Sequence, residues 1–142
     1  MILYLDTSSL LKCLIDEVHT ADVLQWVDAA GAVATSRVTF PEAAAALARR
    51  RRLGDLTSAA ARGALRHLAL RWDGFMLVDL SEIRAGDLAT RHSLRGFDAV
   101  QLAAALTVRS AVGARDIAFS SFDRALCQAA AREGLIVLEP GR

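Results

Sequence analysis

Residues 1–11 read MILYLDTSSLL, a short apolar run that stops at Asp6 and continues into small hydroxyl residues. The apolar part, residues 2–5, has the length and two-sided apolar character of a parallel strand that is covered on both faces. Either Thr7 or Ser8 is an adequate N-cap for a following helix, so Asp6 is not needed for that purpose. The carboxylate at the tip of a core strand therefore calls for an explanation from the rest of the chain.

Short apolar runs alternate with longer segments of helical period along the whole sequence. Further strands are expected at AVATS (32–36), FMLVD (75–79), IAFSS (117–121) and LIVLE (135–139). Helices are expected at 8–16, 20–30, 41–52, 56–72, 81–92, 97–110 and 123–134, the last ending at Gly134. This alternation favours right-handed crossovers and a mostly parallel sheet with helices on both sides. We predict an α/β fold, a three-layer α/β/α sandwich.

Composition narrows the class of protein. A chain of 142 residues with 54% hydrophobic and 23% charged residues is expected to form one globular domain, residues 1–142. Because no apolar run reaches the roughly 18 residues of a membrane span, and no secretion signal is recognisable, we expect a cytoplasmic protein without membrane contact. The two cysteines lack the spacing of a zinc site. The net charge is only +1, although LARRRRLG (47–54) concentrates four arginines.

Four acids are expected at one edge of the sheet. In parallel sheets ligands bind at the carboxyl ends of the strands, where the following helices begin. Asp6 ends the first strand, and Glu42, Asp98 and Asp123 each stand at the start of a predicted helix. Each also has a structural explanation, because Thr39 and Glu42 have capping-box spacing and the two later aspartates suit a helix N-terminus. These explanations do not account for all four sharing one edge.

Two other acids were weighed for the same edge. Asp79 follows a strand and is able to reach it, although Ser81 and Glu82 indicate an ordinary helix start equally well. Asp116 precedes its strand, which places it at the opposite edge.

A cluster of such carboxylates requires protonation, separation or a bound cation, because two of them about 4 Å apart repel by roughly 4 kcal/mol at an effective dielectric near 20. Oxygen ligands without nearby His or Cys select Mg²⁺ or Mn²⁺. Ser8 and Ser121, each two residues from an acid, are candidates to orient carboxylates or metal-bound water, or else are ordinary turn residues. Arg49 lies seven residues after Glu42 and, with Arg50, suits an RNA phosphate or simply complements a helix C-terminus.

The motifs LDTSSLL, TFPEAAAAL, RGFDAVQLAAAL and SSFDRAL, in this order, resemble the PIN-domain ribonucleases and, more narrowly, VapC-type toxins of bacterial toxin–antitoxin systems. The resemblance implies the PIN α/β/α sandwich. It implies an endoribonuclease dependent on Mg²⁺ or Mn²⁺ that cleaves tRNA, rRNA or mRNA and so inhibits translation and growth. It also implies a homodimer and a cognate VapB-type antitoxin. Position by position, the implied catalytic residues are Asp6, Glu42, Asp98 and Asp123, with Asp6, Asp98 and Asp123 as metal ligands.

Two alternatives stay open at this point. One is a PIN nuclease acting in RNA processing or on structured DNA. The other is a non-catalytic α/β module that binds one Mg²⁺ in an acidic pocket. A receiver-like module of this kind expects paired acids after the first strand and a late lysine, whereas this sequence has a lone Asp6 and Lys12 as its only lysine.

Overall fold

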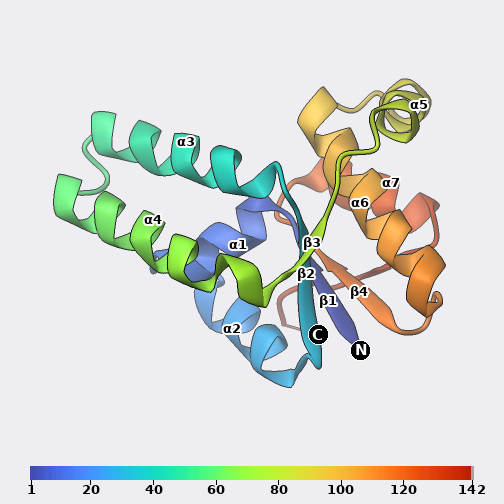
Figure 1. Cartoon of the computed structure of the whole chain (residues 1–142), viewed down its shortest axis with the longest axis horizontal. Helices are drawn as coiled ribbons and strands as arrows, with labels where there is room; N and C mark the ends of the chain where they lie inside the picture. The colour runs from blue at the N-terminus through green and yellow to red at the C-terminus, as the bar shows by residue number, and fades with distance from the viewer. Residues whose placement is uncertain (142) are drawn as a thin grey trace.

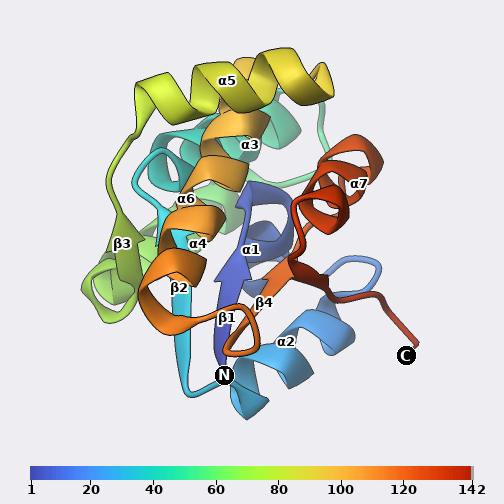
Figure 2. The same ribbon diagram turned by 90° about the vertical axis from the view of Figure 1, so that its right-hand side faces the viewer.

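The computed structural model describes residues 1–141 and has one sheet of five parallel strands (Figures 1 and 2). The strands are β1 (Ile2–Leu5), β2 (Ala32–Ser36), β3 (Met76–Val78), β4 (Ile117–Ser120) and β5 (Ile136–Val137). Their order across the sheet is β3-β2-β1-β4-β5, and every neighbouring pair is parallel. All five predicted strands are therefore confirmed, with β1 and β2 at their predicted bounds and the other three shorter than predicted.

Helices connect each strand to the next. They are α1 (Thr7–Leu14), α2 (Thr20–Ala29), α3 (Thr39–Arg52), α4 (Ser58–Arg71), α5 (Glu82–His92), α6 (Gly96–Val112) and α7 (Arg124–Arg132). All seven correspond to predicted helices. A short 3₁₀ turn, Trp72–Gly74, was not predicted and continues directly from α4. Gly134, with φ of +85°, ends the last helix as predicted, and the N–H groups of Gly134 and Leu135 donate back to carbonyls of α7.

The side chains of each strand alternate between two cores, which gives three layers. In β1, Tyr4 packs in the core beneath α5, α6 and α7, whereas Leu3 and Leu5 pack against α1 to α4. In β4, Phe119 and Ala118 divide between the same two cores. Figure 1 shows the two groups of helices on opposite sides of the sheet. The predicted three-layer α/β/α sandwich is confirmed.

The sheet reverses its direction of growth at β1. The chain adds β2 and β3 on one side of β1 and then returns to place β4 on the other side. Ligands of open α/β sheets bind beyond the carboxyl ends of the strands at such a switch point. The fold thus draws attention to the residues that follow β1 and β4. None of the helices found within residues 1–141 is long and apolar enough to cross a membrane.

Candidate functional site

Asp6 lies at the switch point and is almost fully buried, with 4% of its surface exposed. Its Oδ1 accepts hydrogen bonds from the backbone N–H of Ser9 (2.9 Å) and the hydroxyl of Ser8 (2.7 Å), and its Oδ2 accepts one from the hydroxyl of Ser121 (2.6 Å). Asp6 is therefore the N-cap of α1, so the interpretation that Asp6 is not needed as a cap, because Thr7 or Ser8 is adequate, was wrong. The expectation that Ser8 and Ser121 orient a carboxylate agrees with these contacts.

Further bonds join the segments after β1 and β4. The backbone N–H of Asp6 donates to the carbonyl of Ser120 (3.1 Å), and the hydroxyls of Ser9 and Ser120 are 2.8 Å apart. The hydroxyl of Ser8 accepts from the backbone N–H of Phe122 (2.9 Å). These bonds fix the two strand ends against each other, so the position of the Asp6 carboxylate is set by both.

Three of the four predicted acids act on one another electrostatically. Burial, opposed by its three hydrogen bonds and reinforced by the charge of Asp98, raises the pKa of Asp6 from 3.8 to about 6. Burial and the charge of Asp123 raise the pKa of Asp98, with Arg95 opposing. Asp123 is the N-cap of α7 and accepts a bond from the backbone N–H of Leu126 (2.9 Å), while Asp98 lies in the first turn of α6. Asp123 and Asp98 therefore do serve the starts of their helices, and they also interact with each other at the same edge of the sheet.

The buried charge of Asp6 gives a prediction for stability. A carboxyl whose pKa is raised on folding stabilises the folded state below pH 3.8, and this contribution is lost as the pH rises through about 6. Each pH unit between the two values is worth about 1.4 kcal/mol, so the loss is roughly 3 kcal/mol. In EDTA, Asp6→Asn should therefore be more stable than the wild type at pH 7.5, and the difference should vanish near pH 4.

Urea unfolding over this pH range measures the difference. Asp79→Asn is the matched control, because that carboxylate is 86% exposed and its replacement should change the stability at pH 7.5 by less than about 1 kcal/mol. If the free energy of unfolding depends on pH in the same way for Asp6→Asn and the wild type, the Asp6 carboxyl does not ionise in a buried position.

Arg95 is the N-cap residue of α6 and places its guanidinium between two of the acids. Its Nε donates to Oδ2 of Asp98 (3.3 Å), and its Nη2 lies 3.6 Å from Oδ2 of Asp123. Within residues 1–141, no three His, Cys, Asp or Glu side chains are grouped closely enough to hold a metal ion. The donors nevertheless fit a hard cation, because they are carboxylates and hydroxyls and two of them already share one positive charge. Sequence reasoning missed Arg95, although it precedes Asp98 by three residues.

Glu42 belongs to a separate hydrogen-bond network on the same edge. Its Oε1 accepts from the hydroxyl of Thr7 (2.8 Å) and from Nε2 of Gln101 (2.9 Å). The capping-box alternative for Thr39 and Glu42 is wrong, because α3 begins after Val38 and the Thr39 hydroxyl is within 2.8 Å of the Thr35 hydroxyl. The Glu42 carboxylate is thus held by β1–α1 and α6 and not by its own helix.

Gln101 is the centre of that network and was missed by the sequence analysis. It is 2% exposed, and its Oε1 accepts from the hydroxyl of Tyr4 (2.6 Å). Its Nε2 reaches the hydroxyls of Thr39 (3.0 Å) and Thr7 (3.2 Å) as well as Glu42. A single polar residue in the apolar run AVQLAAAL, one turn after Asp98, was the signal that could have found it.

The two other acids that were weighed lie apart from these networks. Asp79 forms an exposed ion pair with Arg37 (2.6 Å), and nothing links it to Asp6 or Asp98. Asp116 precedes β4, and its carbonyl accepts from the backbone N–H of Ile2 at the opposite end of the sheet, as expected.

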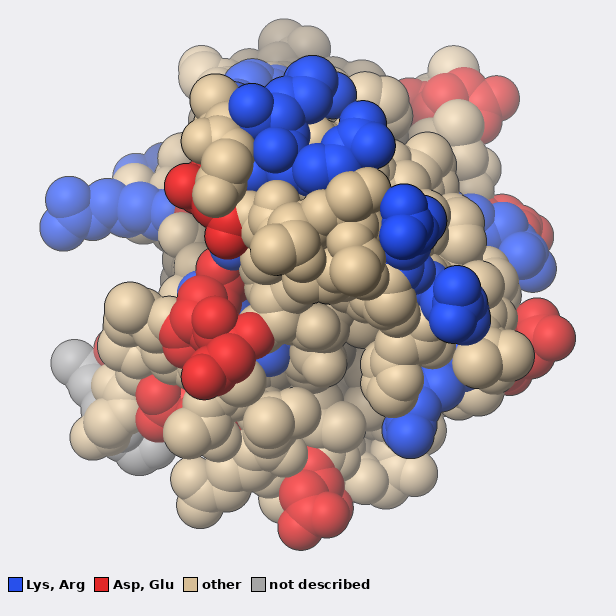
Figure 3. All heavy atoms as spheres, turned by 90° about the vertical axis from the view of Figure 1, so that its left-hand side faces the viewer, with Lys and Arg blue, Asp and Glu red and all other residues tan. Residues whose placement is uncertain are grey.

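The predicted RNA-binding arginines lie at the C-terminal end of α3. Arg49 is exposed, whereas Arg50 forms an ion pair with Glu17 (Nη1 to Oε2, 2.7 Å). Figure 3 shows Lys and Arg side chains gathered over the end of the molecule where α3 and α4 meet, beside a run of acidic side chains. The ion pair with Glu17 offsets the charge of Arg50. RNA binding by Arg49 and Arg50 stays a prediction.

The fold and the acids at its switch point define a class of protein, and sequence comparison identifies the same one. The PIN domain family model matches residues 3–132, so the chain belongs to the PIN-domain family. Two curated relatives from Mycobacterium tuberculosis are Ribonuclease VapC45 (strain CDC 1551 / Oshkosh) and Ribonuclease VapC49 (strain ATCC 25618 / H37Rv). Each is 37% identical over 128 residues, which cover 88% of this chain and 86% of the relative. The likeness to VapC-type PIN ribonucleases is thereby confirmed.

Solved structures agree on the fold. PAE2754 from Pyrobaculum aerophilum matches with a TM-score of 0.67 at 22% identity, over 96% of this chain and 83% of that one. FitAcB from Neisseria gonorrhoeae matches with a TM-score of 0.64 at 19% identity, over 99% of this chain and 98% of that one. The predicted PIN-like fold is thus confirmed.

Proposed function

We propose that this protein is a metal-dependent endoribonuclease toxin that hydrolyses phosphodiester bonds of cellular RNA and thereby stops translation and growth. The observation that carries the proposal is the chain of interacting carboxyls Asp6, Asp98 and Asp123 at the switch point of the sheet. The relatives named as VapC ribonucleases, at 37% identity over most of the chain, support the choice of RNA as the substrate.

Asp6, Asp98 and Asp123 would hold Mg²⁺ or Mn²⁺, which when bound supplies an activated water and stabilises the charge on the leaving oxygen. Ser8, Ser121 and the N–H of Ser9 orient the Asp6 carboxylate for this task. Arg95 pairs with the negative charges of Asp98 and Asp123 and would have to release them for these two acids to hold a cation. Glu42, fixed by Thr7 and Gln101, would orient the attacking water and take its proton.

On the same likeness we propose a VapB-type antitoxin as the protein partner, a homodimer as the assembly and the cytoplasm as the place of action. Co-expression with the antitoxin should restore growth, and light scattering should give twice the mass of the chain. The second candidate, a PIN nuclease of RNA processing, predicts no growth arrest on expression.

Sequencing of RNA 5′ ends after induction tests the function directly. New ends at a small number of sites in tRNA, rRNA or mRNA are expected with the wild type and not with Asp6→Ala. Purified protein should cut the same RNA in Mg²⁺ or Mn²⁺ and lose this activity in EDTA. Identical RNA ends for the wild type and Asp6→Ala would overturn the proposal, and cleavage that persists in EDTA would overturn its metal dependence.

A further inference from the structure

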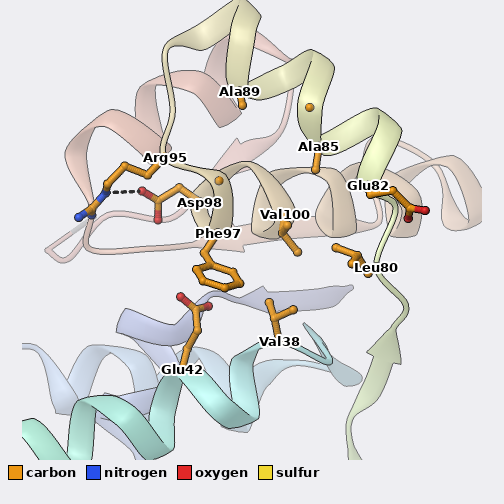
Figure 4. Close-up of a pocket in the computed structure, with 12 residues that line it drawn as sticks. Val38, Glu42, Leu80, Glu82, Ala85, Ala89, Arg95, Phe97, Asp98 and Val100 are labelled. Carbon is orange, nitrogen blue, oxygen red and sulfur yellow. Dashed lines mark hydrogen bonds and ion pairs between the residues drawn. The ribbon is translucent and has the colours of Figure 1, made fainter.

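A pocket of about 690 Å³ opens directly beside Glu42 and Asp98, between the start of α3, α5 and the start of α6 (Figure 4). This volume lies within the range of about 300–1,000 Å³ that is usual for sites of small organic groups. Apart from the acids and Arg95, the side chains that shape it are mainly apolar: Val38, Leu80, Phe97 and Val100. The pocket is therefore continuous with the candidate catalytic acids yet chemically different from them.

Phe97 is the unusual member of this lining. Its side chain points into the pocket next to Glu42 and Val38 (Figure 4) and is 60% exposed, although it directly precedes Asp98. The other four phenylalanines each pack against an aromatic ring: Phe40 and Phe75 on Trp72, Phe119 on Tyr4 and Phe122 on His19. Among the residues that the structure describes, Phe97 is the phenylalanine for which no ring partner is found. An open aromatic face thus borders the catalytic edge.

We propose that this pocket binds an unstacked nucleobase of the RNA, next to the scissile phosphate, with Phe97 as the ring on which that base stacks. The proposal rests on the proposed ribonuclease function. Proteins recognise single-stranded RNA largely by stacking splayed bases on aromatic side chains. A base is neutral, so it tolerates the nearby carboxylates of Glu42 and Asp98, which repel a phosphate that has no cation to hold it. The apolar walls from Val38, Leu80 and Val100 suit its faces and edges.

The base and the scissile phosphate of the RNA thus bind at neighbouring parts of the same sheet edge. The phosphate belongs with the acids and their cation, and the base belongs over Phe97. This arrangement makes Phe97 a residue of substrate binding, and it leaves the chemical step to the acids. Its removal should consequently raise KM and change kcat little.

Binding is measured with short single-stranded RNAs that carry 2-aminopurine at each position flanking the mapped cut site, in an Asp6→Asn background that leaves the RNA intact. Stacking on Phe97 should quench the fluorescence at one position. Phe97→Ala should weaken binding about 10-fold, as expected for the loss of one base–aromatic stack, and abolish the quenching. Phe97→Trp should stay within about 3-fold of the parent protein, since it keeps an aromatic face.

The same substitutions in the otherwise wild-type chain are tested for cleavage. Phe97→Ala should raise KM by about 10-fold, with kcat within about 3-fold. Ile83→Ala is the matched control, because Ile83 is an apolar side chain on α5 that is 85% exposed and does not line the pocket. It should leave binding and KM unchanged. Circular dichroism should show the same fold and melting temperature for all variants, given the exposure of both side chains.

The results distinguish failure of the pocket from failure of the proposed function, except where the protein binds no RNA at all. A Phe97→Ala variant that cuts RNA with the KM of the wild type overturns the base pocket and leaves the ribonuclease intact. A wild type that cuts no RNA but binds it in a Phe97-dependent way refutes the proposed function and supports the pocket. If the protein binds no RNA, both fall. A Phe97→Ala variant that binds and cuts RNA normally but no longer retains a co-expressed antitoxin assigns the pocket to a protein partner and overturns the RNA proposal.

Discussion

Asp6→Asn should lower the rate of metal-dependent RNA cleavage by about 10³-fold or more. The three bonds to Ser8, Ser9 and Ser121 place this carboxylate at the centre of the candidate site, and the loss of its charge would remove a proposed ligand of the cation. Metal-ion catalysis contributes several kcal/mol to phosphodiester hydrolysis, and 4 kcal/mol corresponds to about 10³-fold. Initial rates on a short RNA containing the mapped cut site, at saturating Mg²⁺ or Mn²⁺, provide the measurement.

The substitution separates chemistry from folding. Asparagine is as good an N-cap as aspartate, so α1 should keep its start and the variant should remain folded. Asp79→Asn, just after β3, is the matched control, because its exposed carboxylate pairs with Arg37 and its replacement should leave the rate unchanged. A folded Asp6→Asn protein that cleaves within 10-fold of the wild type would remove Asp6 from the metal site.

Gln101→Leu should lower the free energy of unfolding by roughly 3 kcal/mol. The change preserves most of the side-chain volume but leaves the fully buried hydroxyl of Tyr4 without its acceptor and takes one donor from Glu42. An unsatisfied buried polar group costs about 1–3 kcal/mol, and a lost hydrogen bond to a charged group adds to this. Urea unfolding of the purified variant at constant pH measures the loss.

A double variant tests the cause. In Tyr4→Phe/Gln101→Leu the orphaned hydroxyl is absent, so about 1–2 kcal/mol of the loss should be recovered relative to Gln101→Leu alone. A single variant that loses less than 1 kcal/mol, or a double variant with no recovery, would show that the network around Gln101 contributes little to stability.

The sequence predicted the architecture well because strand and helix periods are local properties. The bounds of β1 and β2 were predicted to the residue, and every α-helix of the described chain was anticipated. The last strand was predicted over 135–139, but only Ile136 and Val137 pair with β4. The apolar composition of residues 135–139 indicates that the segment is buried. The length of a strand, however, depends on how many of its residues pair with the neighbouring strand, here β4.

The acids of the candidate site and the two serines that bond Asp6 were predictable from the sequence, whereas the other supporting residues were not. Asp6, Glu42, Asp98 and Asp123 follow from the rule that parallel strands end at one edge. The run AVQLAAAL marks Gln101 as unusual, but its partner Tyr4 and the true role of Thr7 depend on contacts between residues 35 to 97 positions apart, which no local pattern encodes. Thr7 is the first residue of α1, and since Asp6 takes the cap, its hydroxyl is left to reach Glu42.

The switch point at β1 has a consequence for when activity arises during synthesis. Asp6 is synthesised 115 residues before its partner Ser121, and the acid Asp123 follows two residues later. Domains fold as units as they are synthesised from the N-terminus. A nascent chain that lacks β4 has Asp6 but lacks the bonds with Ser120 and Ser121 that fix it, and so has no assembled site. If the protein is the RNA-cutting enzyme proposed above, its site is therefore assembled only after β4 and the residues that follow it have been made.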